Sequence, residues 1–130
     1  MVELKFRLYD KLDNKMIYDE AGLSLMMSLD GDYSVAKLGE TGWKSNESKY
    51  YEIMQYIGRK DKNNKDIYVD DYVRCITNLY DISYDEILPI IWRENSLQFD
   101  TEHGVSLELL NQNEIEVVGN IYENEELLND

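Results

Sequence analysis

The chain contains one cysteine, one histidine and one proline among its 130 residues. A single cysteine, Cys75, excludes an intrachain disulfide, so the fold does not depend on an oxidising compartment. Structural zinc needs clustered cysteine or histidine ligands, and Cys75 and His103 alone do not provide them within one chain. We therefore expect a fold that needs neither a metal nor a cofactor.

A long apolar run is also missing. No segment approaches the roughly 18 apolar residues that a transmembrane helix needs. The opening segment, MVELKFRLYD, has no apolar core of the kind found in signal peptides. We expect a soluble protein of the bacterial cytoplasm, without membrane contact, organised as one domain over residues 1–130.

Basic residues are scarce in the second half of the chain. Residues 1–65 hold 11 Lys and Arg against 11 Asp and Glu, whereas residues 66–130 hold 2 against 16. The second half therefore carries the whole formal charge of −14, which repels nucleic acid phosphate and favours basic partners. Two interpretations stay open: a surface that serves solubility, and an acidic mimic of DNA that inhibits a basic host or phage DNA-binding protein.

The aromatic composition favours strands. There are 11 tyrosines against 2 phenylalanines, and tyrosine suits half-buried strand positions where the hydroxyl stays in water. Period-two patterns bounded by turn residues predict a mainly β fold with at most two short helices. The predicted strands are 2–8, 15–18, 33–38, 51–58, 66–69, 72–80, 87–92, 97–99 and 115–121. Segments 21–29 and 105–110 fit a strand or a helical turn equally well.

Some local features follow from single residues. In the first strand, alternation places Leu8 toward the core and Arg7 toward water. Asn64 tolerates positive φ and predicts a tight turn, and residues 81–85 are expected as a loop. Pro89 has no N–H for a ladder, so it is expected at a sheet edge or bulge.

We find no catalytic residues in the sequence. Cys75 lies in an apolar strand pattern, which is typical of a buried structural thiol rather than a nucleophile. His103 lies in a turn-like segment, and no glycine-rich phosphate loop or nucleophile elbow is present. A calcium loop starting at Asp61 is excluded because its central glycine and closing glutamate are missing. We therefore predict no catalytic, cofactor-binding or metal-binding residues.

Two features are candidate partner contacts. Trp43 lies in segment 39–48, which is expected as a long exposed loop, and tryptophan is enriched at interface hot spots. The second candidate is a basic turn, which we define as Arg59, Lys60, Lys62 and Lys65. This turn could contact a phosphate backbone, but with −14 overall we expect no direct nucleic acid binding.

Three ordered pieces of the chain resemble one family. They are LKFRLYD at 4–10, MQYIGRKDKNNKDIYVDDYV at 54–73 and EVVGNIYENEEL at 116–127, and together they are similar to the YopX-like family of phage and prophage proteins. Asn64, Asp70 and Glu125 depart from the family pattern, all at turn positions.

The resemblance implies several coiled antiparallel sheets with a small barrel of the Src-homology type that begins near Tyr68. It also implies a phage or prophage origin, and it supplies no activity because the family is one of unknown function. We expect a non-enzymatic protein-interaction or self-assembling module, a homo-oligomer or a protein with an unknown protein partner, rather than an enzyme.

Overall fold

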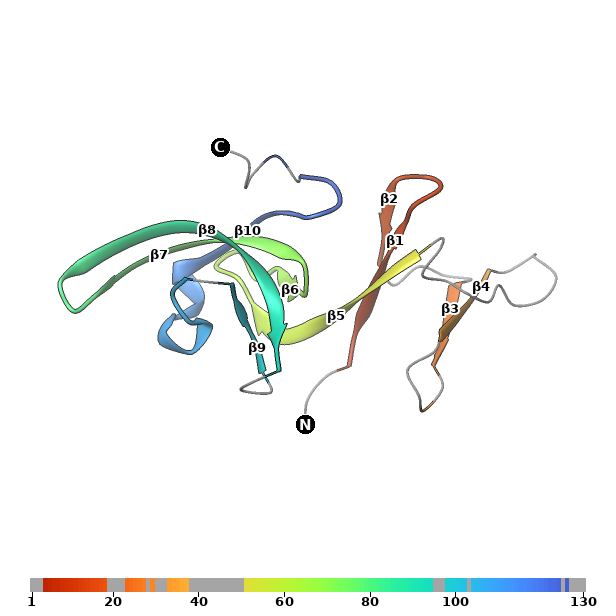
Figure 1. Cartoon of the computed structure of the whole chain (residues 1–130), viewed down its shortest axis with the longest axis horizontal. Helices are drawn as coiled ribbons and strands as arrows, with labels where there is room; N and C mark the ends of the chain where they lie inside the picture. Colours follow the sequence, from red (N-terminus) through yellow and green to blue (C-terminus); the bar gives the residue numbers. More distant parts are fainter. Residues whose placement is uncertain are drawn as a thin grey trace. The chain divides into compact units, whose positions relative to one another are not determined.

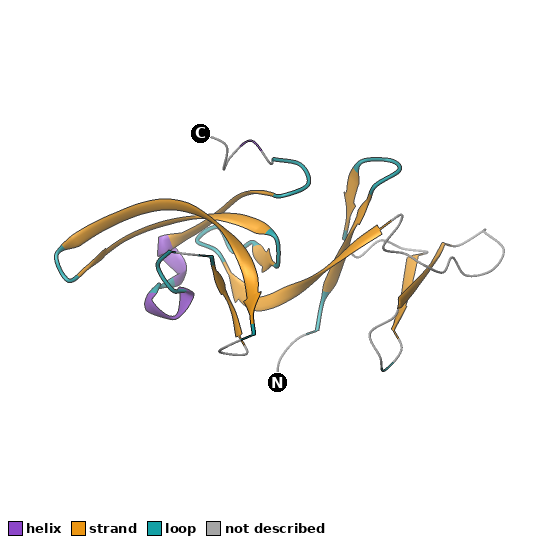
Figure 2. Ribbon diagram, viewed as in Figure 1, coloured by secondary structure: helices purple, strands orange, loops and turns teal. Residues whose placement is uncertain are grey.

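Strands dominate the computed structural model, which describes residues 4–18, 23–27, 29, 33–37, 51–94, 98–102, 104–124 and 126 (Figure 2). The strands are β1 (Phe6–Asp10), β2 (Lys15–Ile17), β3 (Leu23–Met27), β4 (Tyr33–Lys37), β5 (Tyr51–Lys60), β6 (Asp66–Tyr68), β7 (Asp71–Leu79), β8 (Ile82–Arg93), β9 (Gln98–Thr101) and β10 (Ile115–Asn120). Two short 3-10 helices, η2 (Leu107–Leu109) and η3 (Gln112–Glu114), lie between β9 and β10. Segment 21–29 thus contains a strand, and segment 105–110 a helical turn.

The strands form antiparallel sheets with the orders β2-β1-β5-β6 and β10-β7-β8-β9, and a β3-β4 hairpin. The sheet β10-β7-β8-β9 is strongly curled into a half-barrel, in which β7 and β8 form a long bent hairpin (Figure 1). These observations confirm the predicted mainly β class with coiled antiparallel sheets. The chain divides into two compact units, residues 6–54 and residues 1–5 with 55–130, and the prediction of a single domain stays a prediction.

Arg7 corrects the alternation predicted for the first strand. Leu8 is buried as expected, but Arg7 is only 2% exposed. Its Nε donates a hydrogen bond to the sulfur of Met54 at 3.3 Å, and its guanidinium lies 6.0 Å from the centroid of the Tyr18 ring. The aliphatic part of arginine and its planar guanidinium both pack well against sulfur and aromatic groups. A pattern that counts arginine only as polar does not predict such burial.

One apolar cluster lies in the larger unit, which consists of residues 1–5 and 55–130. Along β7, Val73 and Cys75 are buried and alternate with exposed Arg74 and Ile76, as expected of a half-buried strand. The buried members of the cluster are Ile67, Val73, Cys75, Ile90, Val105, Leu107, Leu110 and Ile115. The cluster therefore lies between the curled sheet, β6 and η2.

The turn between β7 and β8 is tighter than predicted. Instead of a loop over residues 81–85, two residues make the turn and β8 resumes at Ile82. Tyr80 and Asp81 both have positive φ, 51° and 65°. A two-residue hairpin turn of this kind usually contains Asn-Gly or Asp-Gly, so the pair Tyr80-Asp81 did not predict such a turn from the sequence.

Pro89 lies within β8, which stands between β7 and β9 in the sheet order, and the register with β7 shows no bulge, so the predicted edge or bulge position is wrong. It is the last residue of β8 in register with β7, opposite Tyr72. Pairing with β9 begins one residue later, at Ile90. Proline has no N–H to donate to a neighbouring strand. It lies here at the point where β8 changes partner, a position that tolerates this absence.

A buried carboxylate organises the turn between β5 and β6. Asp61 is 0% exposed; its Oδ1 accepts the backbone N–H groups of Asn63 and Lys65, each at 2.9 Å. Its Oδ2 accepts the N–H of Val117 in β10, also at 2.9 Å. Asn64 has the positive φ, 64°, predicted for this turn. Asp61 therefore joins the turn to one edge of the curled sheet.

We expect Asp61→Ala to lower the free energy of unfolding by about 3 kcal/mol or more, because three backbone donors lose a charged acceptor in a buried position. Urea denaturation followed by circular dichroism measures the change. Asp81→Asn is the matched control: it removes an exposed carboxylate, asparagine tolerates the positive φ, and stability should change by less than about 0.5 kcal/mol. Equal stabilities of the two variants would contradict the role given to Asp61.

Candidate functional site

The basic turn extends from the end of β5 toward β6, and most of its cations have partners within the chain. The Lys60 ammonium lies 2.6 Å from a carboxylate oxygen of Asp66, and that of Lys62 lies 2.7 Å from Glu116. Lys65 is exposed. Two of the four charges of the basic turn are therefore neutralised locally, by Asp66 and Glu116.

Asp66 is the centre of this ion-pair group. Lys5 also reaches it, at 3.0 Å, and the Lys5 ammonium lies 5.0 Å from the centroid of the Tyr56 ring. Burial alone would raise the pKa of Asp66, but the hydrogen bonds from Lys60 and Lys5 outweigh it and lower that pKa below its ordinary value. The hydrogen bond to Asp66 in turn raises the pKa of Lys60.

Arg59 points away from this group and binds the backbone near η2. Its Nη1 donates to the carbonyl oxygen of Leu107 at 2.6 Å and its Nη2 to that of Leu110 at 2.9 Å. The guanidinium therefore holds η2 at its first residue, Leu107, and at the residue that follows it, Leu110; the Leu107 carbonyl also accepts the N–H of Leu110. Arg59 has a structural task here, in addition to the partner contact predicted from sequence.

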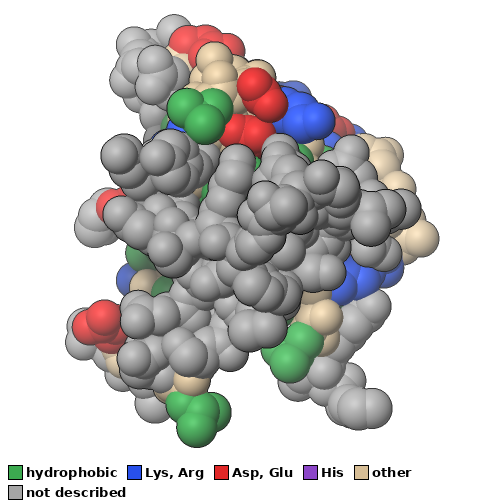
Figure 3. All heavy atoms as spheres, turned by 90° about the vertical axis from the view of Figure 1, so that its right-hand side faces the viewer, with side chains coloured by type: hydrophobic (Ala, Val, Ile, Leu, Met, Phe, Trp, Pro, Cys, Tyr) green, Lys and Arg blue, Asp and Glu red, His purple; other side chains and the backbone are tan. Residues whose placement is uncertain are grey.

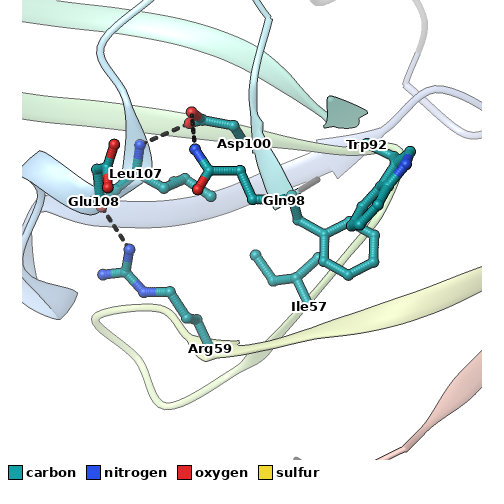
Figure 4. A pocket seen from close by; sticks show the side chains of 8 residues that line it. Ile57, Arg59, Trp92, Gln98, Asp100, Leu107 and Glu108 are labelled. Atoms are coloured by element: carbon teal, nitrogen blue, oxygen red, sulfur yellow. Dashed lines mark hydrogen bonds between the residues drawn. The ribbon is translucent and has the colours of Figure 1, made fainter. Parts of the chain in front are cut away.

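Beside Arg59 lies an open pocket of about 530 Å³, within the usual range for ligand sites (Figure 4). The side chains that line it come from β5, β8, β9 and η2. The lining consists of Ile57, Arg59, Trp92, Gln98, Phe99, Asp100, Leu107 and Glu108.

An aromatic pair forms one wall of the pocket. Trp92 of β8 lies opposite Phe99 of β9 in the register, and the two rings meet edge to face with centroids 4.8 Å apart. Trp92 is 44% exposed although it lies on the same side of β8 as the fully buried Ile90. Alternation alone therefore does not indicate that Trp92, the last residue of the predicted strand 87–92, reaches the surface.

The two carboxylates of the pocket differ in their surroundings. Asp100 is 4% exposed and accepts hydrogen bonds from the N–H of Leu107 at 2.8 Å and the hydroxyl of Ser106 at 2.9 Å. Its second oxygen lies 3.5 Å from Nε of Arg93. Glu108 is exposed, so it is the carboxylate that an incoming group meets first.

The groups best known for nucleophilic chemistry lie elsewhere. Cys75 is buried in the core, and burial, with smaller contributions from Glu86 and Asp100, raises its pKa to about 11. A thiol of this kind is protonated and inert at neutral pH. His103 and Trp43 lie outside the described residues. Within the described part of the chain, no three His, Cys, Asp or Glu side chains are grouped to hold a metal ion.

The described geometry defines a class: a small acidic β protein built on a curled sheet, with an open pocket lined by two aromatic rings and charged side chains. No helix in the described part is long and apolar enough to cross a membrane. The family model described as YopX protein matches residues 5–129, and the chain therefore belongs to the YopX family. No curated protein matches the chain significantly.

Two solved structures share the fold. The chain is similar to protein yopX from Bacillus subtilis, with 23% identity, a TM-score of 0.68 and coverage of 95% of both chains. It is also similar to protein EF1440 from Enterococcus faecalis, with 21% identity, a TM-score of 0.60 and coverage of 98% of this chain and 99% of that one. At these identities the likeness concerns the fold.

The ion-pair group at Asp66 predicts a pH effect. In Lys60→Met the pKa of the Asp66 carboxyl should rise, because one of its two hydrogen-bond donors is lost. A carboxyl with a lowered pKa stabilises the fold above its ordinary value of 3.8, and this contribution is lost as pH falls through the folded-state pKa. In Lys60→Met the contribution is therefore smaller, and it disappears at a higher pH.

Carbon-13 NMR titration of the Asp66 carboxyl measures its pKa directly. Lys65→Met is the matched control, because it removes a charge from the same turn but no hydrogen bond to Asp66. Its effect on the pKa of Asp66 should be small by comparison. Identical titration curves in the wild type and in both variants would refute the assignment.

Proposed function

We propose that this protein is a non-enzymatic prophage module of the bacterial cytoplasm that acts by binding another protein. The observation that carries the proposal is the open pocket with Trp92 on its wall. Tryptophan is strongly enriched among the residues that dominate binding energy, and a half-exposed indole fixed against a second ring provides contact area with little entropy left to lose.

The lining of the pocket supports binding more than catalysis. Among the described residues, the lining contains no serine, cysteine, histidine or lysine. Of its two carboxylates, Asp100 already accepts backbone and hydroxyl hydrogen bonds. General acid–base catalysis needs titratable groups that a substrate can reach, and Asp100 is buried, so the described lining offers no pair of accessible carboxylates. Membership of the YopX family and the resemblance to phage and prophage proteins support the proposed origin.

The acidic mimic of DNA receives less support. Asp71 and Asp100 are buried and serve the fold, while Asp66, Asp85 and Glu116 pair with basic side chains. The acids of the second half are thus partly used within the fold, whereas a mimic needs them spread as continuous surface charge. Figure 3 faces the side on which β1 to β4 are drawn in Figure 1, so the acidic and basic side chains that lie together at its upper end say nothing about the acids of residues 66–130.

We expect Trp92→Ala to reduce the amount of partner protein captured from host cells by about ten-fold, because truncation of a hot-spot tryptophan costs a large part of the binding energy. Affinity purification with quantitative mass spectrometry measures the capture. The control is Tyr80→Asn, which removes a 93% exposed aromatic side chain at the β7–β8 turn and suits its positive φ.

Two results would overturn the proposed function. One is equal capture by the wild type and Trp92→Ala. The other is a wild type that retains nothing above background and sediments as a monomer. Washing at high salt separates the mimic, since binding that depends on bulk charge is released by salt whereas an aromatic contact is retained.

A further inference from the structure

We infer that the pocket binds a cationic side chain, arginine or lysine, presented by an extended segment of a basic protein partner. This inference rests on the proposed function and adds the chemistry of the partner. Three features of the described residues carry it: an open space beside an edge strand, an aromatic surface, and a surplus of negative charge.

The space lies between two strands that do not pair with each other. Among the described strands, β9 is the last of the curled sheet and pairs with β8 alone. Ile57 and Arg59 extend from β5 on the other side of the pocket (Figure 4). Between them Gly58 has a φ of 88°, where the register of β5 with β6 is irregular, and no described atom lies within 4 Å of a Cβ placed there. An extended peptide is the shape that fits beside a free strand edge.

The aromatic wall suits a cation. The Trp92 ring is 44% exposed, and its edge-to-face packing on Phe99 holds it in place without covering it. A guanidinium or ammonium within about 6 Å of an indole centroid is attracted by the ring quadrupole, and tryptophan is the strongest of the aromatic partners. The same ring would also take an uncharged apolar group, so the charges of the pocket decide between them.

Those charges favour a cation. The lining holds two carboxylates, Asp100 and Glu108, and one guanidinium, Arg59. Asp100 is already paired with Arg93, whose Nε lies 3.5 Å away. Arg59 is directed at the carbonyls of Leu107 and Leu110, so Glu108 is the exposed carboxylate that a cation would meet. Residues 66–130 as a whole carry a formal charge of −14, and a field of this sign attracts basic segments and repels acidic peptides and nucleic acid.

The test uses a short fluorescein-labelled peptide that alternates arginine with serine, and the same peptide with citrulline at each arginine. Fluorescence anisotropy should show saturable binding of the arginine peptide and much weaker binding of the citrulline peptide. In proton–nitrogen NMR spectra the indole signal of Trp92 should move during the titration; the Trp92→Phe variant assigns that signal, since the chain has 2 tryptophans.

Two variants locate the binding site. Glu108→Gln should weaken binding of the arginine peptide about five-fold, the value of one partly exposed ion pair. Trp92→Leu should weaken it about ten-fold through loss of the cation–π contact. Asp81→Asn is the control for bulk charge, because it also removes one exposed carboxylate but far along the chain at the β7–β8 turn, and it should leave the affinity almost unchanged.

Equal weakening by Glu108→Gln and Asp81→Asn would overturn the inference, because binding would then follow net charge and not the pocket. Equal affinity for the arginine and citrulline peptides would overturn it as well. If the arginine peptide fails to bind while Trp92→Ala still loses the cellular partner, the cationic ligand is wrong and the protein-binding function stands. If the arginine peptide does not bind and no partner protein is captured from cells, both the cationic ligand and the proposed protein-binding function are wrong.

Discussion

The larger unit depends on the buried carboxylate of Asp61. A charged group out of contact with water is costly unless every oxygen finds a donor, and here both oxygens do. Two of its donors, Asn63 and Lys65, belong to the turn that follows it, and the third, Val117, lies in β10, 56 residues later in the chain. One side chain therefore sets the shape of a hairpin turn and the place where a distant strand joins it.

Two further buried acids close loops in the same way. Asp71 accepts the N–H of Tyr68 at 2.8 Å, and Asp100 accepts that of Leu107, also at 2.8 Å. Bonds of this kind are charge-assisted and stronger than those between neutral groups. They explain why part of the acidic composition contributes to architecture and not to the surface field. The hydrogen bond from Leu107 to Asp100 also holds η2 beside β9, next to the pocket that Arg59 and Trp92 line.

Much of the fold could be predicted because its strands obey local rules. The alternation in β7, the turn at Asn64 and the break at Asp70, with φ of 71°, follow from side-chain periodicity and from residues that tolerate positive φ. The failures have a common cause. Arg7 is buried by Met54, and Pro89 lies at a change of strand partner, so both depend on residues distant in sequence.

The candidate site was harder to predict from the sequence than the fold. The basic turn was visible as a cluster of charges, but its ion pairs with Asp66 and Glu116 were not, and neither was the pocket beside it. The sequence by itself determined the mainly β class, the strand periodicity, the acidic second half and the family. Only the tertiary structure decided which charges are buried and which aromatic ring is exposed. Strand periodicity depends on residues that are adjacent in the sequence. Burial at the end of a strand depends on contacts with residues that are distant in the sequence.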